Sequence, residues 1–429
     1  MKSSILSLSP TTGGTDISTT LSPPSQAPSQ APNLLVAPDG ASFDWFGTSV
    51  DHDAGHIVIG AEEDGDLGQS SGSVHVWSTL SGYITKLTAP DGAAADNFGG
   101  DVGVSGTTIV VGAPLTDSVF TDSGSTYLFQ TNGAHITTIV SPDAHAIDGG
   151  NRFGYSVAIS GTNVVIGAPG ILNIHESVGV VYLYDTAGKF ITKWEESFPA
   201  SECGHSVAIE GTYVAVGCPK SFESSMTSGS AYLHDLNAEA TYKLLPSLAS
   251  PGMEFGYSIA LSSEKVIVGA RKADGGAADQ RGAAYLFRLN GSLERKIQAP
   301  DNRADLDACG QSVDISSSLI IVGCPDQDGN QTDSGVSYVF NSWGDYIDTL
   351  VPDVEYGSGH FGYDVSVEGT SIIVGAPKYP GRDDLAAAGA AYKYEVNDFP
   401  THSPTIFVSP SEFPTEFPTI SVSPSQVPK

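Results

Sequence analysis

The chain has 429 residues, of which 49 are acidic and 19 are basic, so its formal net charge is −30. Nucleic acids and anionic membrane surfaces attract lysine and arginine, and this balance argues against both as partners. No run of about eighteen apolar residues predicts a transmembrane segment.

The chain begins with a segment that cannot form a core. Residues 1–33 are rich in Ser, Thr and Pro, and a disordered segment is predicted there. The opening MKSSILSLSP lacks the apolar stretch of about 7–15 residues that a signal peptide needs. We therefore expect either that the true start lies upstream or that export is unconventional.

A pattern of three glycines then repeats seven times along the chain, as at Gly154, Gly167 and Gly179. The first glycine usually follows an aromatic residue, and the second stands at a constant distance from it, mostly in Gly-Ala-Pro. The third follows after a similar interval and opens a run such as SGSTYLF. The period is roughly 50 residues, and self-similarity at this period is typical of propellers and solenoids.

Every repeat contains three short strand-like runs, as in SVAIS (156–160), VVIGA (164–168) and VVYLY (180–184). In six of the seven repeats a fourth run follows the third, as HITTIV (135–140) does in the second repeat. Four antiparallel strands form one propeller blade. The seventh repeat lacks its fourth run, but a copy, LLVAPDG (34–40), stands before the first. The sequence thus predicts an all-β, seven-bladed propeller over residues 34–397, closed by an N-terminal strand.

The motifs FGYSVAISGTNVVIGAP (153–169) and FGYDVSVEGTSIIVGAP (361–377) resemble the FG-GAP repeat of integrin α-subunit propellers. The resemblance implies the propeller fold and, more loosely, a role in adhesion at the cell surface. Integrin-type repeats often carry a DxDxDG calcium loop between the FG and GAP strands. Two-residue turns replace it here, so that metal site does not carry over.

Four cysteines take positions that the pattern gives to other residues. Cys203 and Cys309 replace the aromatic before the first glycine, and Cys218 and Cys324 replace the Ala of Gly-Ala-Pro. Each pair is centred on a tight two-residue turn, which places its members opposite each other in a hairpin. We expect disulfides Cys203–Cys218 and Cys309–Cys324; the alternative is two pairs of buried thiols.

Disulfides would indicate an extracellular or cell-surface location. Two glycosylation sequons, at Asn290 and Asn330, agree with that compartment. Residues 398–429 are again rich in Ser, Thr and Pro and are expected to form a disordered tail or stalk. One hypothesis is that the chain is a segment of a longer protein.

Long, variable connections should lie on one face, where a ligand would bind. That face is acidic, and calcium is a possible cofactor because it prefers several oxygen ligands from a flexible loop. The candidate ligands come from DQDGNQTD and EEDGD: Asp326, Asp328, Asn330, Asp333, Glu63, Asp64 and Asp66. An ordinary set of turn residues is the alternative. Trp45, Phe120, Tyr356 and Tyr379 are candidate ligand-face aromatics.

No catalytic motif such as GxSxG or HExxH is present, and the sequence favours a non-enzymatic role. The leading hypothesis is an extracellular propeller that binds a protein or carbohydrate. The propeller domain of a secreted hydrolase and a structural cell-wall component without a discrete ligand are the alternatives.

Overall fold

The structure is a computed structural model. It describes residues 33–143, 150–170, 179–195, 201–223, 226–273, 281–300, 307–329, 331–354, 356–380 and 385–396. β-Strands are the regular elements of these ranges. No helix in them has the length and apolarity needed to cross a membrane.

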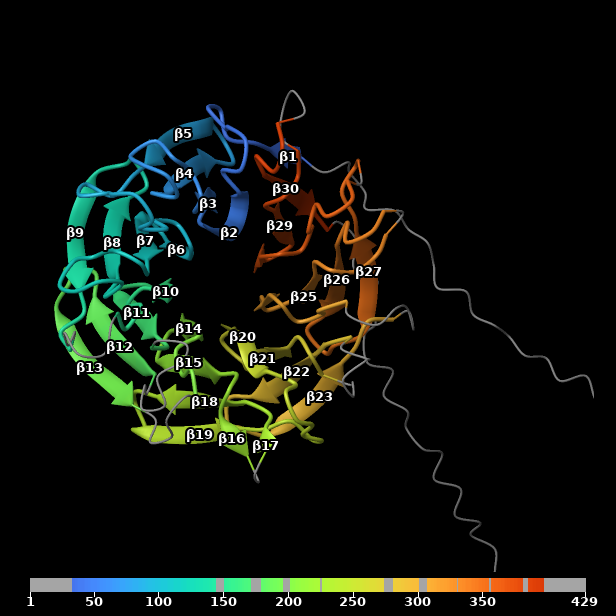
Figure 1. The fold of residues 1–429 in the computed structure, drawn as a ribbon. Coiled ribbons are helices and arrows are strands. Elements are labelled where there is room, and N and C mark those ends of the chain that lie inside the picture. Colours follow the sequence, from blue (N-terminus) through green and yellow to red (C-terminus); the bar gives the residue numbers. More distant parts are fainter. Residues whose placement is uncertain are drawn as a thin grey trace, which may run out of the picture. The chain divides into compact units, whose positions relative to one another are not determined.

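Seven four-stranded antiparallel sheets are arranged around a central axis as the blades of a propeller (Figure 1). The innermost strands, in blade order, are β2 (Phe46–Asp53), β6 (Val102–Ser105), β10 (Ser156–Ser160), β14 (Ser206–Glu210), β20 (Phe255–Leu261), β24 (Val313–Ile315) and β28 (Val365–Glu368). The second strands are β3 (His56–Ala61), β7 (Thr108–Ala113), β11 (Asn163–Ala168), β15 (Tyr213–Cys218), β21 (Lys265–Ala270), β25 (Leu319–Cys324) and β29 (Ser371–Ala376).

The two outer positions of each blade complete the sheets. The third strands are β4 (Ser73–Ser78), β8 (Ser125–Gln130), β12 (Val180–Asp185), β18 (Ser230–Asp235), β22 (Ala283–Arg288), β26 (Val336–Asn341) and β30 (Ala390–Glu395). The fourth are β5 (Gly82–Leu87), β9 (His135–Val140), β13 (Phe190–Glu195), β19 (Ala240–Leu244), β23 (Leu293–Ile297), β27 (Tyr346–Leu350) and, in blade seven, β1 (Asn33–Leu35).

The ring closes through strand β1, as the sequence predicts. This strand pairs antiparallel with β30, with Leu34 opposite Tyr392 and Leu35 opposite Ala391. It supplies the fourth strand that blade seven lacks, so the last blade is built from both ends of the propeller sequence. The predicted fold class is confirmed.

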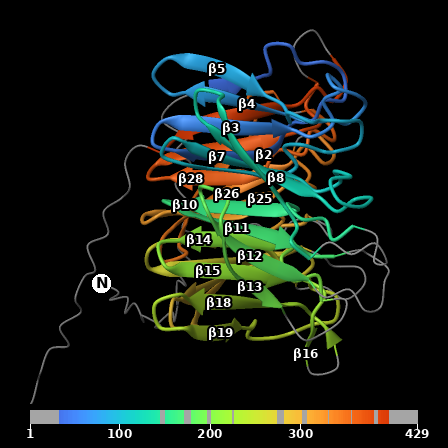
Figure 2. The same ribbon diagram turned by 90° about the vertical axis from the view of Figure 1, so that its left-hand side faces the viewer.

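The connections divide into two faces, seen in profile in Figure 2. Short turns join strands one to two and three to four on one face. The longer connections from strand two to three, and from each blade to the next, lie on the other, which we call the long-loop face. Blade four carries an extra hairpin on this face, formed by β16 (Phe222–Glu223) and β17 (Met226–Thr227).

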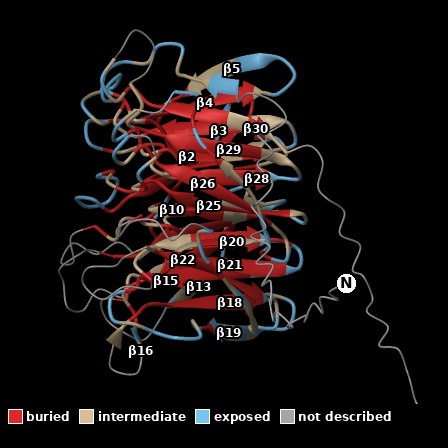
Figure 3. Cartoon of the chain, turned by 90° about the vertical axis from the view of Figure 1, so that its right-hand side faces the viewer, coloured by how far each residue is buried: buried red, intermediate tan, exposed pale blue. Residues whose placement is uncertain are grey.

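The inner and middle strands are buried and the outermost strands are partly exposed (Figure 3). The aromatic of the FG motif meets the tyrosine of the third strand edge to face. Phe153 and Tyr182, for example, have ring centroids 5.3 Å apart, and both side chains have no exposed surface. Edge-to-face pairs of this kind add about 1 kcal/mol beyond area burial.

The repeated glycines form the contact between neighbouring blades. A Cβ on Gly112 of blade two would lie 2.0 Å from the carbonyl oxygen of Gly154 in blade three. A Cβ on Gly124 would lie 2.1 Å from the carbonyl oxygen of Phe153. The same two approaches recur at every blade boundary, with distances of 2.0 to 2.3 Å. The three-glycine pattern is therefore the signature of an interface in which one backbone lies directly against another.

Both expected disulfides are present. Cys203 bonds to Cys218 and Cys309 to Cys324, with Cα–Cα distances of 4.0 and 4.1 Å. In blade five the corresponding residues, Phe255 and Ala270, are direct cross-strand partners. In blades four and six a covalent bond thus takes the place of a Phe–Ala contact.

A first prediction concerns the interface between blades. Gly112→Ala should lower the free energy of unfolding by about 3 kcal/mol, because its Cβ would overlap backbone that cannot move without shifting a blade. Urea unfolding measures the effect. Gly65→Ala is the control, since its nearest neighbour would be 3.8 Å away. Equal stability of the two variants would contradict this account of the interface.

A second prediction concerns the disulfide of blade four. Cys203→Ala with Cys218→Ala should cost about 3 kcal/mol of unfolding free energy, because the bond closes a short loop in the unfolded chain. Cys203→Phe with Cys218→Ala, the pair found in blade five, should recover part of the loss by filling the vacated volume. If a reductant leaves the wild-type unfolding midpoint unchanged, the bond contributes no stability.

Candidate functional site at the mouth of the central channel

The innermost strands of all seven blades line a central channel of about 620 Å³. Its wall is polar along much of its length. This size falls in the range of pockets that hold small ligands.

One half of the wall carries buried carboxylates. Each accepts a hydrogen bond from a backbone N–H of the innermost strand of the next blade. This N–H lies on the edge of the strand that faces the channel, where no further strand pairs with it. The contacts are Asp364 with Val50, Asp51 with Val104, Asp101 with Val157 and Asp314 with Val367, at 2.6 to 2.7 Å. These four residues belong to blades seven, one, two and six.

Burial and mutual repulsion disfavour the charged forms of these carboxyl groups. Burial raises the pKa of Asp51 and of Asp364 to about 6, and that of Asp314 to about 7. The pKa of Asp101 is also raised well above its usual range, first by burial and then by the nearby Asp364.

Serines tie the blades together in the other half. The hydroxyls of Ser156, Ser206 and Ser258 donate to the carbonyl oxygens of Gly204, Gly256 and Gly310 in the next blade, at 2.8 to 3.0 Å. These bonds are neutral, so the two halves of the channel differ in charge.

At the long-loop mouth, each blade contributes the residue that follows its first glycine. The set is Thr48, Gly100, Tyr155, His205, Tyr257, Gln311 and Tyr363. Backbone strain orients the chain just before it. The residue that precedes the FG aromatic, or the cysteine in its place, has φ between 52° and 56° in every blade, a left-handed conformation uncommon for non-glycine residues: Trp45, Asn97, Arg152, Glu202, Glu254, Ala308 and His360.

Blades three to six form a continuous row of contacts at this mouth. The ring of His205 lies 5.1 Å from that of Tyr155 and 4.5 Å from that of Tyr257. The guanidinium carbon of Arg271 lies 3.7 Å from the centre of the Tyr257 ring, and its Nη1 donates to Gln311 at 3.1 Å. Burial lowers the pKa of His205 to about 4, which keeps the imidazole neutral at physiological pH.

Glu254 anchors three cations beside this row. Arg271 Nε lies 2.7 Å from one carboxylate oxygen, and Lys272 Nζ lies 2.9 Å from the other, to which Lys220 Nζ also donates. Burial acts to raise the pKa of Glu254, but these hydrogen bonds and charges outweigh it and lower the pKa to about 2. The carboxylate stays ionised at any physiological pH.

The opposite side of the mouth is acidic. Glu62, just after the end of β3, lines the channel and accepts a hydrogen bond from the hydroxyl of Thr48 at 2.9 Å. Burial raises the pKa of Glu62.

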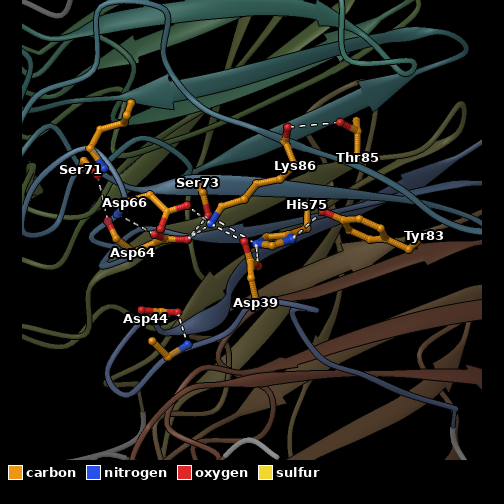
Figure 4. A network of polar contacts seen from close by, with 12 residues as sticks. Asp39, Asp44, Asp64, Asp66, Ser71, Ser73, His75, Tyr83, Thr85 and Lys86 are labelled. Atoms are coloured by element: carbon orange, nitrogen blue, oxygen red, sulfur yellow. Dashed lines mark hydrogen bonds and ion pairs between the residues drawn. The ribbon is translucent and has the colours of Figure 1, made fainter.

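In the EEDGD loop of blade one, two of the candidate calcium ligands contact the ammonium group of Lys86. Lys86 Nζ lies 2.7 Å from Asp64, 2.6 Å from Asp66 and 3.0 Å from Asp39, with the three carboxylates around it (Figure 4). Glu63 accepts a hydrogen bond from the hydroxyl of Ser70. Calcium in this loop would therefore have to displace Lys86.

In the DQDGNQTD loop, the candidate ligands turn to different partners. Asp326 lies 3.4 Å from Nδ1 of His360, and Asp328 accepts the backbone N–H of Asp333 at 2.9 Å. Asn330 lies outside the described residues. Within the described ranges, no three His, Cys, Asp or Glu side chains are grouped as a metal site requires. Calcium remains a prediction.

The four candidate aromatics are only partly brought together. Tyr356 and Tyr379 meet edge to face with centroids 4.9 Å apart. The ring of Trp45 has the ammonium of Lys378 5.7 Å from its centre. Phe120 lies in the β7–β8 loop of blade two and is 36% exposed. Of the two sequon asparagines, Asn290 lies in the β22–β23 turn, and Asn330 is outside the described residues.

Sequence reasoning missed the mouth residues, among them Tyr155, His205, Tyr257, Gln311 and Arg271. The available signal was the repeat itself. Aligned on their first glycines, the blades share framework positions, whereas the position after the glycine varies in chemistry. Arg271 also breaks the pattern by replacing the proline of Gly-Ala-Pro.

The fold and site define a seven-bladed β-propeller with a polar channel mouth. A family model described as the FG-GAP repeat matches residues 33–77, 82–129, 136–184, 239–287 and 292–340, more than half of the chain. The chain belongs to the FG-GAP repeat family. Each match runs from the fourth strand of one blade to the third of the next, so the sequence repeat is offset from the blade by one strand.

Among solved structures the chain has distant matches. The crystal structure of BamB from Moraxella catarrhalis is similar, with 15% sequence identity, a TM-score of 0.45, and a match that covers 85% of this chain and 96% of that one. At this TM-score the likeness carries no argument about this chain. No curated protein matches the sequence.

A third prediction follows from the channel carboxylates. Between its unfolded pKa of 3.8 and its folded pKa of about 7, Asp314 binds more protons in the folded chain, so its contribution to stability falls as pH rises. The variant Asp314→Ala carries the residue that blades three to five have at this position. The difference between its Tm and that of wild type should therefore rise by about 3 °C from pH 5 to pH 8.

The test uses the difference between variant and wild type because buried histidines such as His205 have the opposite sign. Their lowered pKa makes stability rise with pH between about 4 and 6.5. A Tm difference that stays constant from pH 5 to pH 8 would show that Asp314 does not titrate in this window.

Proposed function

We propose that this protein is a binding propeller that acts outside the cell and recognises a protein or carbohydrate through its long-loop face. The observation that supports this most is the channel mouth, where a rigid ring presents chemically different side chains at equivalent positions. Binding residues on a fixed scaffold are typical of recognition modules. Fold membership alone would not carry this argument, since one fold hosts many functions.

Two further features support the extracellular setting. Both disulfides need an oxidising compartment to form and persist. Asn290, within an Asn-Gly-Ser sequon, lies in a tight turn on the face opposite the mouth. A glycan there would leave the mouth open.

A fourth prediction tests binding. The full chain is applied to an array of glycans and matrix proteins, once in millimolar Ca²⁺ and once in EDTA. We expect a ligand whose binding falls about tenfold in Tyr363→Ala, since aromatic residues at the centre of an interface contribute most to affinity. Trp343→Ala is the control: this tryptophan is 64% exposed on the opposite face.

The same array decides the role of calcium. Binding lost in EDTA and in Asp326→Ala with Asp328→Ala would establish a cation-dependent surface, and binding indifferent to EDTA would remove calcium from the proposal. No ligand in either buffer would count against adhesion and favour a structural component. Release of products from an arrayed glycan would instead favour a hydrolase.

A further inference from the structure

The long-loop mouth is electrically polarised in a way that the overall charge does not predict. In a chain of net charge −30, three cations from blades four and five gather around one carboxylate. Within the described residues, the ion pairs of Lys220, Arg271 and Lys272 all go to Glu254. Three positive charges against this one negative charge leave two in excess around Glu254, and Asp326 of blade six also acts electrostatically on Arg271.

The cations are placed to meet a ligand from solution. The side chain of Glu254 is 4% exposed, whereas those of Lys220 and Lys272 are 41% and 36% exposed. The buried carboxylate therefore fixes the ammonium groups while their surfaces stay open to solvent. Arg152 and Glu202, which also act electrostatically in this region, add one charge of each sign.

Hydrogen-bond acceptors lie across the channel from these cations. Glu62 reaches the mouth from blade one, and deeper in the wall stand Asp101 and Asp364. Between the two sides lie the phenol of Tyr363 and the amide of Gln311, which can each donate and accept. One side of the space thus favours an anion and the other favours hydroxyl donors.

We propose that the channel mouth binds a carboxylate-bearing sugar, with its carboxylate against Lys220 and Lys272 and its hydroxyl groups directed to the Glu62 side. This inference rests on the proposed binding function and specifies its ligand. A uronate ring combines one anion, several hydroxyl donors and apolar C–H faces. The polarised mouth and its half-buried tyrosines Tyr155, Tyr257 and Tyr363 offer a counterpart to each of these groups.

An acidic peptide fits these observations less well. Its carboxylates would use the cations, but its side chains offer few hydroxyl donors for the acidic side. Its backbone would offer one N–H donor per residue to this side, but each backbone carbonyl would find no donor among carboxylates, which can only accept hydrogen bonds when ionised.

The experiment compares tetragalacturonate with its fully methyl-esterified form, titrated into the full chain by calorimetry. The acid should bind about tenfold more tightly than the ester. Added salt should weaken the binding of the acid but not that of the ester. Lys220→Ala and Lys272→Ala should each weaken the acid about fivefold without changing the ester. Glu62→Gln should weaken both forms, because both carry the hydroxyl groups.

Lys378→Ala is the matched control. Lys378 holds the same repeat position in blade seven as Lys220 and Lys272 do in blades four and five, but its ammonium lies beside Trp45 and His360. The variant Lys378→Ala should bind the acid with an affinity within about twofold of that of wild type. A loss of affinity equal to that in Lys220→Ala would show that the effect comes from the overall charge of the chain, and it would overturn the site. Unchanged Tm values confirm that the variants fold.

Equal affinity for acid and ester, or no binding of either, would also overturn the acidic-sugar proposal. The array separates this failure from that of the proposed function. If a neutral glycan or a protein binds there and Tyr363→Ala weakens it, the binding function stands and only the ligand class is wrong. If the array finds no ligand, both proposals fail.

Discussion

The contact on which the structure depends is the direct approach of one blade's backbone to the next. The second and third glycines of each blade lie against the Phe-Gly or Cys-Gly segment of its neighbour, at distances that leave no room for a side chain. Backbone hydrogen bonds reinforce this approach, as when the N–H of Phe153 donates to the carbonyl oxygen of Ser123 at 3.1 Å. Seven such boundaries close a ring, so the position of each blade constrains the others.

This rigid framework leaves side chains at the channel free to differ. The innermost strands share a backbone path, yet Asp51 and Asp314 stand where blades three to five carry alanine. In the acidic half, carboxyl oxygens accept the N–H groups of the open strand edges, and burial raises the pKa of these carboxyl groups. Asymmetry in a symmetric fold is what gives the mouth a basic and an acidic side.

The irregular blades show how the same interface tolerates substitution. Blades four and six lose the FG aromatic and gain a disulfide in the same place, so covalent closure of the hairpin replaces an aromatic contact. Blade one has His75 where other blades have tyrosine, and its ring still meets Phe46 edge to face at 5.4 Å. Lys86 joins this blade to the segment after β1 through Asp39, beside the point where the ring closes.

The sequence by itself determined the fold, the closing strand and the pairing of the cysteines. Each of these follows from local rules repeated at a constant spacing: glycine at close backbone approaches, alternation within strands, and the geometry of a two-residue turn. Only the tertiary structure decided how the loops meet. Lys220 and Glu254 belong to different repeats, Asp51 and Asp364 belong to the first and the last, and no local pattern links the members of either pair. The ring brings them together because it sets neighbouring blades, including the first and the last, side by side around one axis.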